Sequence, residues 1–334
     1  MKIKRRRLAG LAVGMTLALG LTACSSSGGA QEEAASGGGE GATGGSVDTE
    51  RYTIAMVTHE APGDTFWDKI RAGAEDAAQA LNVELNYSNN NEAPEQATLV
   101  QNAVDQQVDG LAVTLAFPDA VGPAMQAAAE ADIPVVAFNS GLGNYQEYGA
   151  EMYFGSDETA AGNAVGERIA EDGGQKAICV IQEQGQVALE TRCAGVAETF
   201  PSTENLNVEG TDLPSVRATI GAKLQQDPAI THIVTLGAPF ALTALEAKGD
   251  AGSEAQVVTF DLNADAAQQI ADGNITFSVD QQPYVQGFMA VQSLWLNLTN
   301  GNDLGGGGPV LTGPSFVDSE NIDQILPYAQ NNTR

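Results

Sequence analysis

The chain has 334 residues, too many for one small core and enough for two packed lobes. Its formal net charge is −28, and five of its 15 basic residues lie in the first seven positions; without them, 10 basic residues remain against 43 acidic ones, a net charge of −33. So acidic a surface repels nucleic acid and anionic lipid, which argues against a nucleic-acid partner.

The N-terminus has the order of an export signal, with basic residues, an apolar run at 8–21, and then Thr22, Ala23 and Cys24. The run is too short for a membrane-spanning helix. Residues 21–24 resemble the lipobox of bacterial lipoproteins, which implies a signal peptide at 1–23 and acylation of the Cys24 thiol. The alternative is an ordinary secretory signal with an incidental cysteine. We expect an exported protein, lipid-anchored on the outer face of the cytoplasmic membrane.

Residues 24–50 consist mainly of Ser, Gly, Ala and Glu, which cannot bury enough apolar surface to fold, so we expect a disordered tether. Residues 39–44 imitate the glycine spacing of a nucleotide-binding loop. Because no strand precedes them and no helix follows, we interpret the match as compositional.

From residue 52 onward, short β-rich runs alternate with longer segments of helical spacing, which predicts parallel α/β sheets. The first series has predicted strands at 52–57, 83–87, 110–115 and 135–138, with helices at 65–81, 94–106 and 119–131. The second has strands at 152–154, 177–181, 206–209, 232–236 and 257–260, with helices between them. Because both series alternate strands and helices in the same way, they predict two similar doubly wound parallel-sheet lobes. The carboxyl ends of the strands would line a cleft between the lobes.

The last part of the chain contains more predicted elements than one lobe requires. These are a strand at 276–279, an amphipathic helix at 282–298, two short extended pieces and a helix from Ser319. We therefore expect a multi-strand hinge between the lobes. The expected N-terminal lobe comprises 51–152 plus 282–311, and the expected C-terminal lobe comprises 153–281 plus 312–334.

Aromatic and polar side chains follow the predicted strands of the first lobe, where open α/β sheets bind ligands. The candidates are Asp64, Phe66, Trp67, Phe117 and Asn139. An aromatic ring stacks on the C–H face of a sugar, while carboxylate and amide groups hydrogen-bond to hydroxyls. The alternative for Trp67 is inward packing, with Phe66 covering the sheet edge.

The polar candidates of the second series are Glu190, Arg192, Asp261 and Gln281. Arg192 presents a fixed fork of donors suited to two adjacent oxygens, although a structural ion pair with Asp261 or Glu190 is the alternative. Asp261 follows a β-rich run and has acceptors for two vicinal hydroxyls. Buried there, its carboxylate needs a cationic or hydroxyl partner.

Cys179 lies in an apolar run and Cys193 in the following helical segment, so a disulfide between strand and helix is geometrically plausible in an exported protein. Closing so short a loop contributes roughly 3 kcal/mol. A pair of buried thiols is the alternative. A catalytic cysteine is not supported, because His59 and His232, the only histidines, have no evident partner.

From about residue 52 to its end, the chain resembles the type I periplasmic sugar-binding proteins of the ribose and glucose/galactose group, the solute receptors of ABC transporters. The matching stretches are 63–67, 133–139, 155–162, 192–195, 258–261 and Gln281. The resemblance implies sugar contacts by Phe66, Trp67, Asn139, Arg192, Asp261 and Gln281. Asp64 resembles the acidic contact of the glucose/galactose members.

The chain departs from the ribose receptors at two places. They have Asp-Arg where this chain has Asn139 and Ser140, and a polar Asn is usual in the stretch that here reads Leu-Gly-Ala-Pro-Phe at 236–240. Phe240 then supplies an apolar contact in place of a hydrogen bond. These departures argue against ribose and leave a hexose, a deoxy sugar, a cyclic polyol such as inositol, or a sugar-like signal.

The leading hypothesis is therefore a monomeric receptor that captures a small neutral sugar or polyol and delivers it to an ABC permease. The alternative is a receptor that presents an autoinducer or nutrient to a membrane sensor. An enzyme is disfavoured because we find no nucleophile elbow and no metal-binding spacing, and no cofactor or metal is expected. A sugar-responsive repressor would need an N-terminal helix-turn-helix in place of the lipobox.

Overall fold

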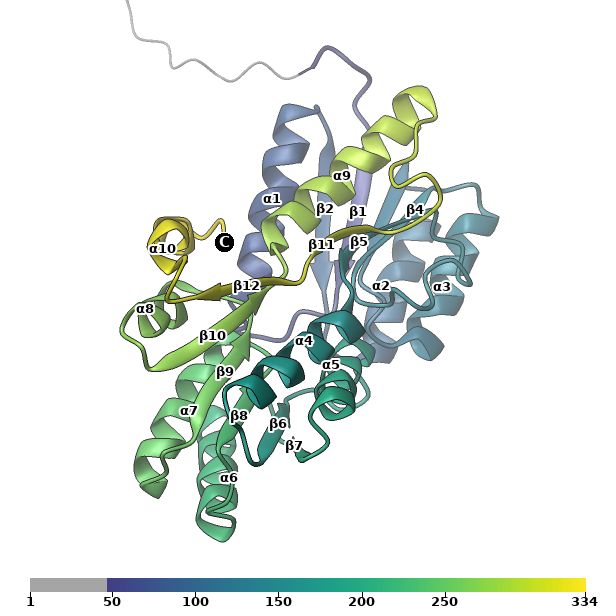
Figure 1. Cartoon of the computed structure of the whole chain (residues 1–334). Helices are drawn as coiled ribbons and strands as arrows, with labels where there is room; N and C mark the ends of the chain where they lie inside the picture. Colours follow the sequence, from purple (N-terminus) through teal and green to yellow (C-terminus); the bar gives the residue numbers. More distant parts are fainter. Residues whose placement is uncertain (1–46) are drawn as a thin grey trace, which may run out of the picture. The chain divides into compact units, whose positions relative to one another are not determined.

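The computed structural model describes residues 47–334 (Figure 1). The predicted signal peptide, Cys24 and most of the predicted tether lie outside the described residues. Within residues 47–334, no helix is long and apolar enough to cross a membrane.

The described part of the chain contains twelve strands and ten helices. The strands are β1 (Thr53–Thr58), β2 (Glu84–Asn89), β3 (Gly110–Val113), β4 (Val135–Asn139), β5 (Met152–Ser156), β6 (Ala177–Ile181), β7 (Thr203–Asn207), β8 (His232–Thr235), β9 (Gln256–Phe260), β10 (Ile275–Asp280), β11 (Val310–Gly313) and β12 (Ser315–Asp318). The helices are α1 (Phe66–Ala80), α2 (Ala93–Asp105), α3 (Pro118–Glu130), α4 (Glu158–Glu171), α5 (Val187–Thr199), α6 (Leu213–Gln226), α7 (Ala238–Ala251), α8 (Ala264–Ala271), α9 (Pro283–Asn300) and α10 (Ile322–Gln330).

The strands form two six-stranded sheets, one in each lobe. The first has the order β11-β5-β4-β3-β1-β2, and the second has the order β12-β10-β9-β8-β6-β7. Every neighbouring pair is parallel except β10 and β12, which are antiparallel. The two orders correspond strand for strand, so the predicted class of two similar parallel-sheet lobes is confirmed.

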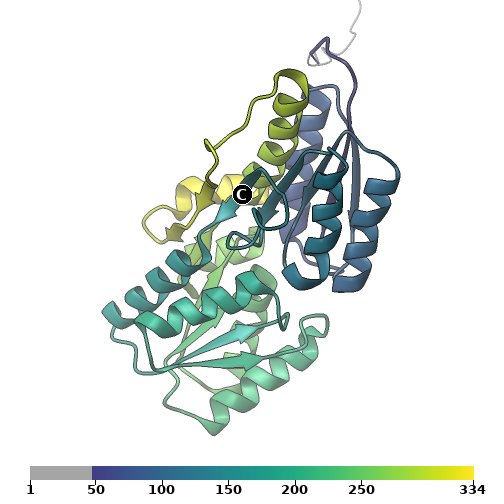
Figure 2. The ribbon, with the colours of Figure 1, turned by 90° about the vertical axis from the view of Figure 1, so that its right-hand side faces the viewer.

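In the first lobe, both faces of the sheet are covered by helices because its strands are apolar on both sides. Ile54 and Met56 pack against α1 and α9, whereas Ala55 and Val57 face α2 and α3. Successive side chains of a strand point to opposite faces, so an unbroken apolar run needs a helical layer on each. Helices α1 and α9 lie side by side although they are far apart in the sequence (Figures 1 and 2).

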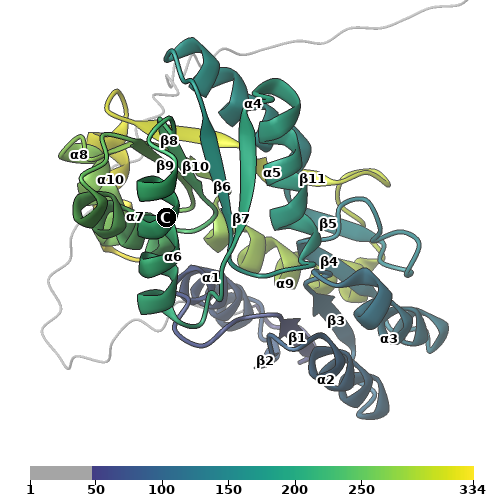
Figure 3. The same cartoon turned by 90° about the horizontal axis from the view of Figure 1, so that it is seen from below.

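The second lobe repeats this arrangement. Ile178 and Val180 of β6 pack on the side of α6, α7 and α8, while Cys179 and Ile181 pack on the side of α4 and α5. Figure 3 shows α4 and α5 on one side of this sheet and α6 and α7 on the other.

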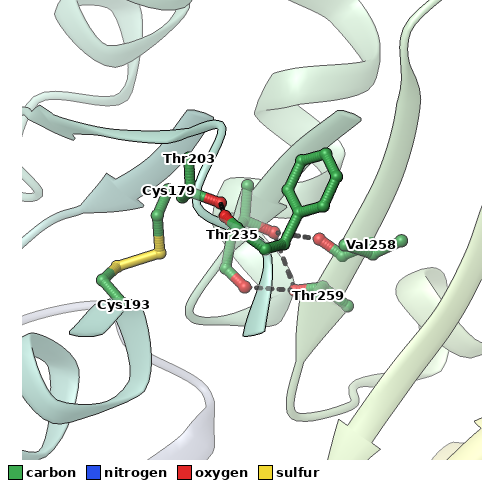
Figure 4. Close-up of a disulfide and its surroundings, with 7 residues drawn as sticks. Cys179, Cys193, Thr203, Thr235, Val258 and Thr259 are labelled. Atoms are coloured by element: carbon green, nitrogen blue, oxygen red, sulfur yellow. Dashed lines mark hydrogen bonds between the residues drawn. A yellow bond between two sulfur atoms is a disulfide. The ribbon is translucent and has the colours of Figure 1, made fainter. Parts of the chain in front are cut away.

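The predicted link between Cys179 and Cys193 is present as a disulfide from β6 to α5, with Cα atoms 5.8 Å apart (Figure 4). Both cysteines are fully buried. Nearby, the hydroxyls of Thr235 and Thr259 on the adjacent strands β8 and β9 hydrogen-bond to each other at 2.8 Å. The disulfide ties the middle of α5 to the sheet, and Arg192 is the residue next to Cys193.

The chain crosses between the lobes three times: after β5, between β10 and α9, and between β11 and β12. The strand at 152–154 was expected to belong to the second lobe, and this expectation is wrong. The segment forms β5, which pairs with β4 in the first sheet. The second lobe therefore begins after Ser156, not at residue 153. In the tail, β11 ends at Gly313, so this crossing lies two residues beyond the expected 311. The strand predicted at 206–209 begins earlier, as β7.

Candidate functional site

Asn139 and Asp261 occupy equivalent places in the two lobes, at the carboxyl ends of β4 and β9. Both have left-handed backbones, with φ of 64° and 62°. Each carbonyl accepts a hydrogen bond from the neighbouring strand, from the Tyr153 hydroxyl at 2.9 Å and from the Ser278 hydroxyl at 2.7 Å, respectively. Non-glycine residues in this conformation cost free energy and cluster at binding sites.

Gln281 joins these two side chains across the hinge. Its Nε2 donates to Asp261 Oδ1 at 2.8 Å, and its Oε1 accepts from Asn139 Nδ2 at 3.2 Å. All three side chains are buried. Three residues predicted from sequence as ligand contacts are therefore linked in one hydrogen-bonded chain, with Gln281 in the middle.

Arg192 makes an ion pair that the sequence did not predict. Its Nε and Nη2 donate to the two carboxylate oxygens of Glu158 at 2.5 and 3.0 Å, in place of a pair with Asp261 or Glu190. Burial alone would lower the pKa of Arg192, but the Glu158 carboxylate outweighs it and raises that pKa. Among the described residues, Nη1 has no hydrogen-bond partner, so the pair orients the guanidinium and leaves the two N–H groups of Nη1 for a ligand.

These residues enclose an inner cavity of about 40 Å³ between the lobes. Seven of the predicted contacts line it: Asp64, Phe66, Trp67, Asn139, Arg192, Asp261 and Gln281. Both rings of the aromatic pair are buried in the core of the first lobe and also face this cavity, so inward packing and cavity lining are combined. A space of roughly 150 Å³ accommodates one benzene ring, so a six-membered ligand needs the cavity to expand.

An outer cavity of about 480 Å³ lies at the mouth of the cleft. Phe117 and Phe240 line this cavity and not the inner one. Asp64, Gln182 and Glu183 line both, so they form the boundary between the two spaces. A ligand that enters the inner cavity from this mouth passes these three side chains.

Glu190 lies outside both cavities, which corrects its prediction as a ligand contact. Its side chain is exposed, and its carboxylate accepts a hydrogen bond from the Gly185 N–H at 3.1 Å. Residues two apart on a helix point in different directions, so Glu190 cannot share the inward direction of Arg192 on α5.

Seven residues that line the inner cavity were absent from the predicted contacts, and three of them are His59, Glu183 and Gln186. Each of these three lies in a segment that directly follows a strand, β1 or β6. The rule that selected Asp64 and Asn139 therefore applied to them too, but these positions carry no motif that separates them from ordinary loop residues.

Burial shifts the titration of the acidic and basic groups around the cavity. It raises the pKa of Asp261 to about 7, partly offset by Arg192 and the Gln281 hydrogen bond. Burial and the nearby Asp64 carboxylate raise the pKa of Glu183 to about 7, while burial and the Arg192 charge lower the pKa of His59 to about 3. Removal from water is thus the main cause of all three shifts.

Within residues 47–334, no group of three or more His, Cys, Asp or Glu side chains is placed to hold a metal ion.

Comparison with known proteins gives the same family as the sequence motifs. Residues 54–303 match the family model described as periplasmic binding protein domain. A solved carbohydrate transporter from Acidothermus cellulolyticus, in complex with myo-inositol, is 51% identical with a TM-score of 0.85, over 85% of this chain and 100% of that one.

Curated relatives are more distant. The xylose/arabinose-binding protein of Sulfolobus acidocaldarius is 24% identical over 300 residues, which are 82% of this chain and 73% of that protein. The ribose import binding protein of Bacillus subtilis is 25% identical over 234 residues, 68% of this chain and 76% of that protein.

The family match runs from β1 to the end of α9 and includes both sheets' parallel cores. The resemblance predicted from sequence is therefore confirmed: the chain belongs to the periplasmic binding protein domain family, as a type I sugar-binding protein of the ABC-transporter group and not an enzyme.

Proposed function

We propose that the protein is the solute receptor of an ABC importer, that it captures a small neutral polyol in its cleft, and that it delivers this ligand to a permease. Our leading ligand is a cyclic hexitol of the myo-inositol type. We further propose that Cys24 carries the lipid anchor, which mass spectrometry of the mature N-terminus would test.

The observation that carries this proposal is the hydrogen-bonded chain Asn139–Gln281–Asp261 beside the oriented guanidinium of Arg192. It sets an amide, a carboxyl and a cationic donor around one small cavity. Each hydroxyl of a polyol both donates and accepts, so alternating donors and acceptors pair with it fully. A ligand lacking one of these hydroxyls would leave a buried group unpaired, which is a strong source of selectivity.

Two further observations favour a cyclitol over ribose. Asn139 and Ser140 replace the Asp-Arg pair of the ribose receptors, and the 51% identical carbohydrate transporter was solved with myo-inositol. Trp67 and Phe66 line the same cavity and supply the apolar faces against which the C–H bonds of a ring pack.

The test is isothermal titration of the protein with myo-inositol, ribose and xylose, followed by the Asp261→Asn variant. We expect myo-inositol to bind most tightly, and Asp261→Asn to lose roughly 10- to 100-fold in affinity, as for a hydrogen bond to a charged group. Asp265→Asn is the matched control, because Asp265 is an exposed carboxylate on α8. Absence of binding by any sugar or polyol would refute the proposal.

Delivery to a permease is tested separately from binding. Cells that lack the protein should take up labelled myo-inositol more slowly than the parent strain. Normal uptake combined with tight binding in vitro would instead favour a sensory role for the receptor.

A further inference from the structure

Gln186 reaches from the second lobe to the first. It caps the N-terminus of α5, where its Oε1 accepts from the Leu189 N–H at 2.8 Å. This bond fixes the orientation of the amide, so Nε2 points across the cleft. It lies 3.1 Å from His59 Nε2 and 3.4 Å from Ser140 Oγ, both in the first lobe.

The contact defines the proton position on His59. An amide nitrogen can only donate, so His59 Nε2 must accept, and the ring proton lies on Nδ1, which is 2.7 Å from Thr114 Oγ1. His59 as a whole is 3% exposed. A neutral imidazole is thus held between one hydrogen bond from its own lobe and one from the other.

Both partners of Gln186 touch a predicted ligand contact. The His59 ring meets the Trp67 ring edge to face, with centroids 4.7 Å apart and an interplanar angle of 80°. Ser140 Oγ donates to Asn139 Oδ1 at 3.2 Å. The Gln186 amide, which itself lines the inner cavity, is therefore linked through His59 to Trp67 and through Ser140 to Asn139.

A backbone contact accompanies this side chain. The Val187 N–H, one residue further along the chain, donates to the Ala116 carbonyl after β3 at 3.0 Å. The start of α5 is thus joined to the first lobe at a point separate from the hinge crossovers.

We propose that Gln186 is a cross-lobe positioning residue. When the lobes meet, its amide docks between His59 and Ser140 and so fixes Trp67 and Asn139 in the geometry that receives the ligand. The ligand part of this inference rests on the proposed function, but its first readout does not require a ligand.

The test uses a Trp295→Phe background, in which Trp67 is the only tryptophan left of the two in the chain. Gln186→Glu keeps an oxygen for the Leu189 N–H but has no amide donor, and Gln186→Ala removes both. At pH 8, where His59 is neutral, we expect both variants to change Trp67 emission in the free protein and to increase its quenching by acrylamide. Both should also bind myo-inositol roughly tenfold more weakly.

Asp212→Ala is the matched control. Asp212 caps α6 of the same lobe by accepting from the Ser215 N–H at 3.1 Å, and neither cavity includes it. This variant should lose stability like Gln186→Ala but leave Trp67 emission unchanged.

Unchanged emission and quenching in Gln186→Glu would overturn the proposal, because only the helix cap would then matter. Changed Trp67 emission in a protein that binds no polyol would refute the proposed function and still support Gln186 as a positioning residue.

Discussion

The backbone conformation favours Asn and Asp at positions 139 and 261, independently of the ligand contacts that we propose for them. Both lie in the left-handed region, which asparagine and aspartate adopt more readily than other residues with a side chain. This turn ends each strand abruptly, and both side chains line the inner cavity. The same local conformation, used once in each lobe, therefore supplies the two residues that Gln281 connects.

Glu183 is the residue for which we predict a clear pH effect on stability. Its pKa rises from 4.5 to about 7 on burial near Asp64. A carboxyl whose pKa is raised by folding stabilises the fold fully below its unfolded pKa, and this contribution is lost as the pH rises through the folded value. Glu183→Gln should therefore match the parent near pH 4 and be more stable at pH 8, by at most about 3 kcal/mol.

Urea denaturation at both pH values measures this difference. The exposed Glu254 provides the control variant Glu254→Gln. Equal free energies of unfolding for Glu183→Gln and the parent protein at pH 8 would contradict the assignment.

At the scale of helices, glycine sets how closely α4 and α5 approach. A Cβ atom on Gly162 would lie 2.2 Å from the Arg192 carbonyl oxygen, and one on Gly195 would lie 2.8 Å from the Thr159 carbonyl oxygen. Such distances are far inside van der Waals contact, so the two backbones touch only because these side chains are absent. This close packing brings Glu158 on α4 to Arg192 on α5.

We predict that Gly162→Ala pushes α5 away from α4. The overpacking should cost roughly 1–3 kcal/mol of unfolding free energy. It should also weaken ligand binding, because Arg192 moves with α5. Gly249→Ala on α7 is the control: its Cβ would meet no atom within 4 Å, so this variant should be slightly more stable than the parent.

Thermal denaturation and titration with myo-inositol measure the two effects. A Gly162→Ala protein with the parent's stability and affinity would show that the helices separate without moving the guanidinium.

The same elements explain what could be predicted from the sequence. Apolar runs and helical spacing located most strands and helices, because the inner strands of each sheet are buried on both faces. The rule that ligands lie beyond strand ends selected Asp64, Asn139 and Asp261. Periodicity does not say which sheet a short strand joins, so β5 was assigned to the wrong lobe.

The partner of Arg192 was also beyond prediction. Glu158 is 34 residues away, and its contact depends on the glycine packing of α4 against α5. Glu190 and Arg192 were both predicted as ligand contacts. The rotation of α5 about its axis decides which of them faces the cleft, and the sequence does not show this rotation.

At the scale of the whole described domain, access to the site depends on movement of the lobes. The inner cavity of about 40 Å³ is bounded by side chains from both lobes, and direct hydrogen bonds such as Val187 N–H to the Ala116 carbonyl join them. A six-membered ring needs a space nearer roughly 150 Å³. The three crossovers form the hinge about which such a movement is expected.

We predict that the free protein samples wider separations of the cleft rim than the ligand-bound protein does. Spin labels on Glu95→Cys of α2 and Ser215→Cys of α6 report this distance, because both positions are exposed and lie near the outer cavity on opposite lobes. Cys179 and Cys193 form a disulfide and would not be labelled. Pulsed electron paramagnetic resonance should show a broad distribution that narrows and shortens with saturating myo-inositol. In the Asp261→Asn background the same narrowing should need roughly 10- to 100-fold more myo-inositol. One unchanging distance in all samples would mean that the ligand enters by side-chain rotation alone.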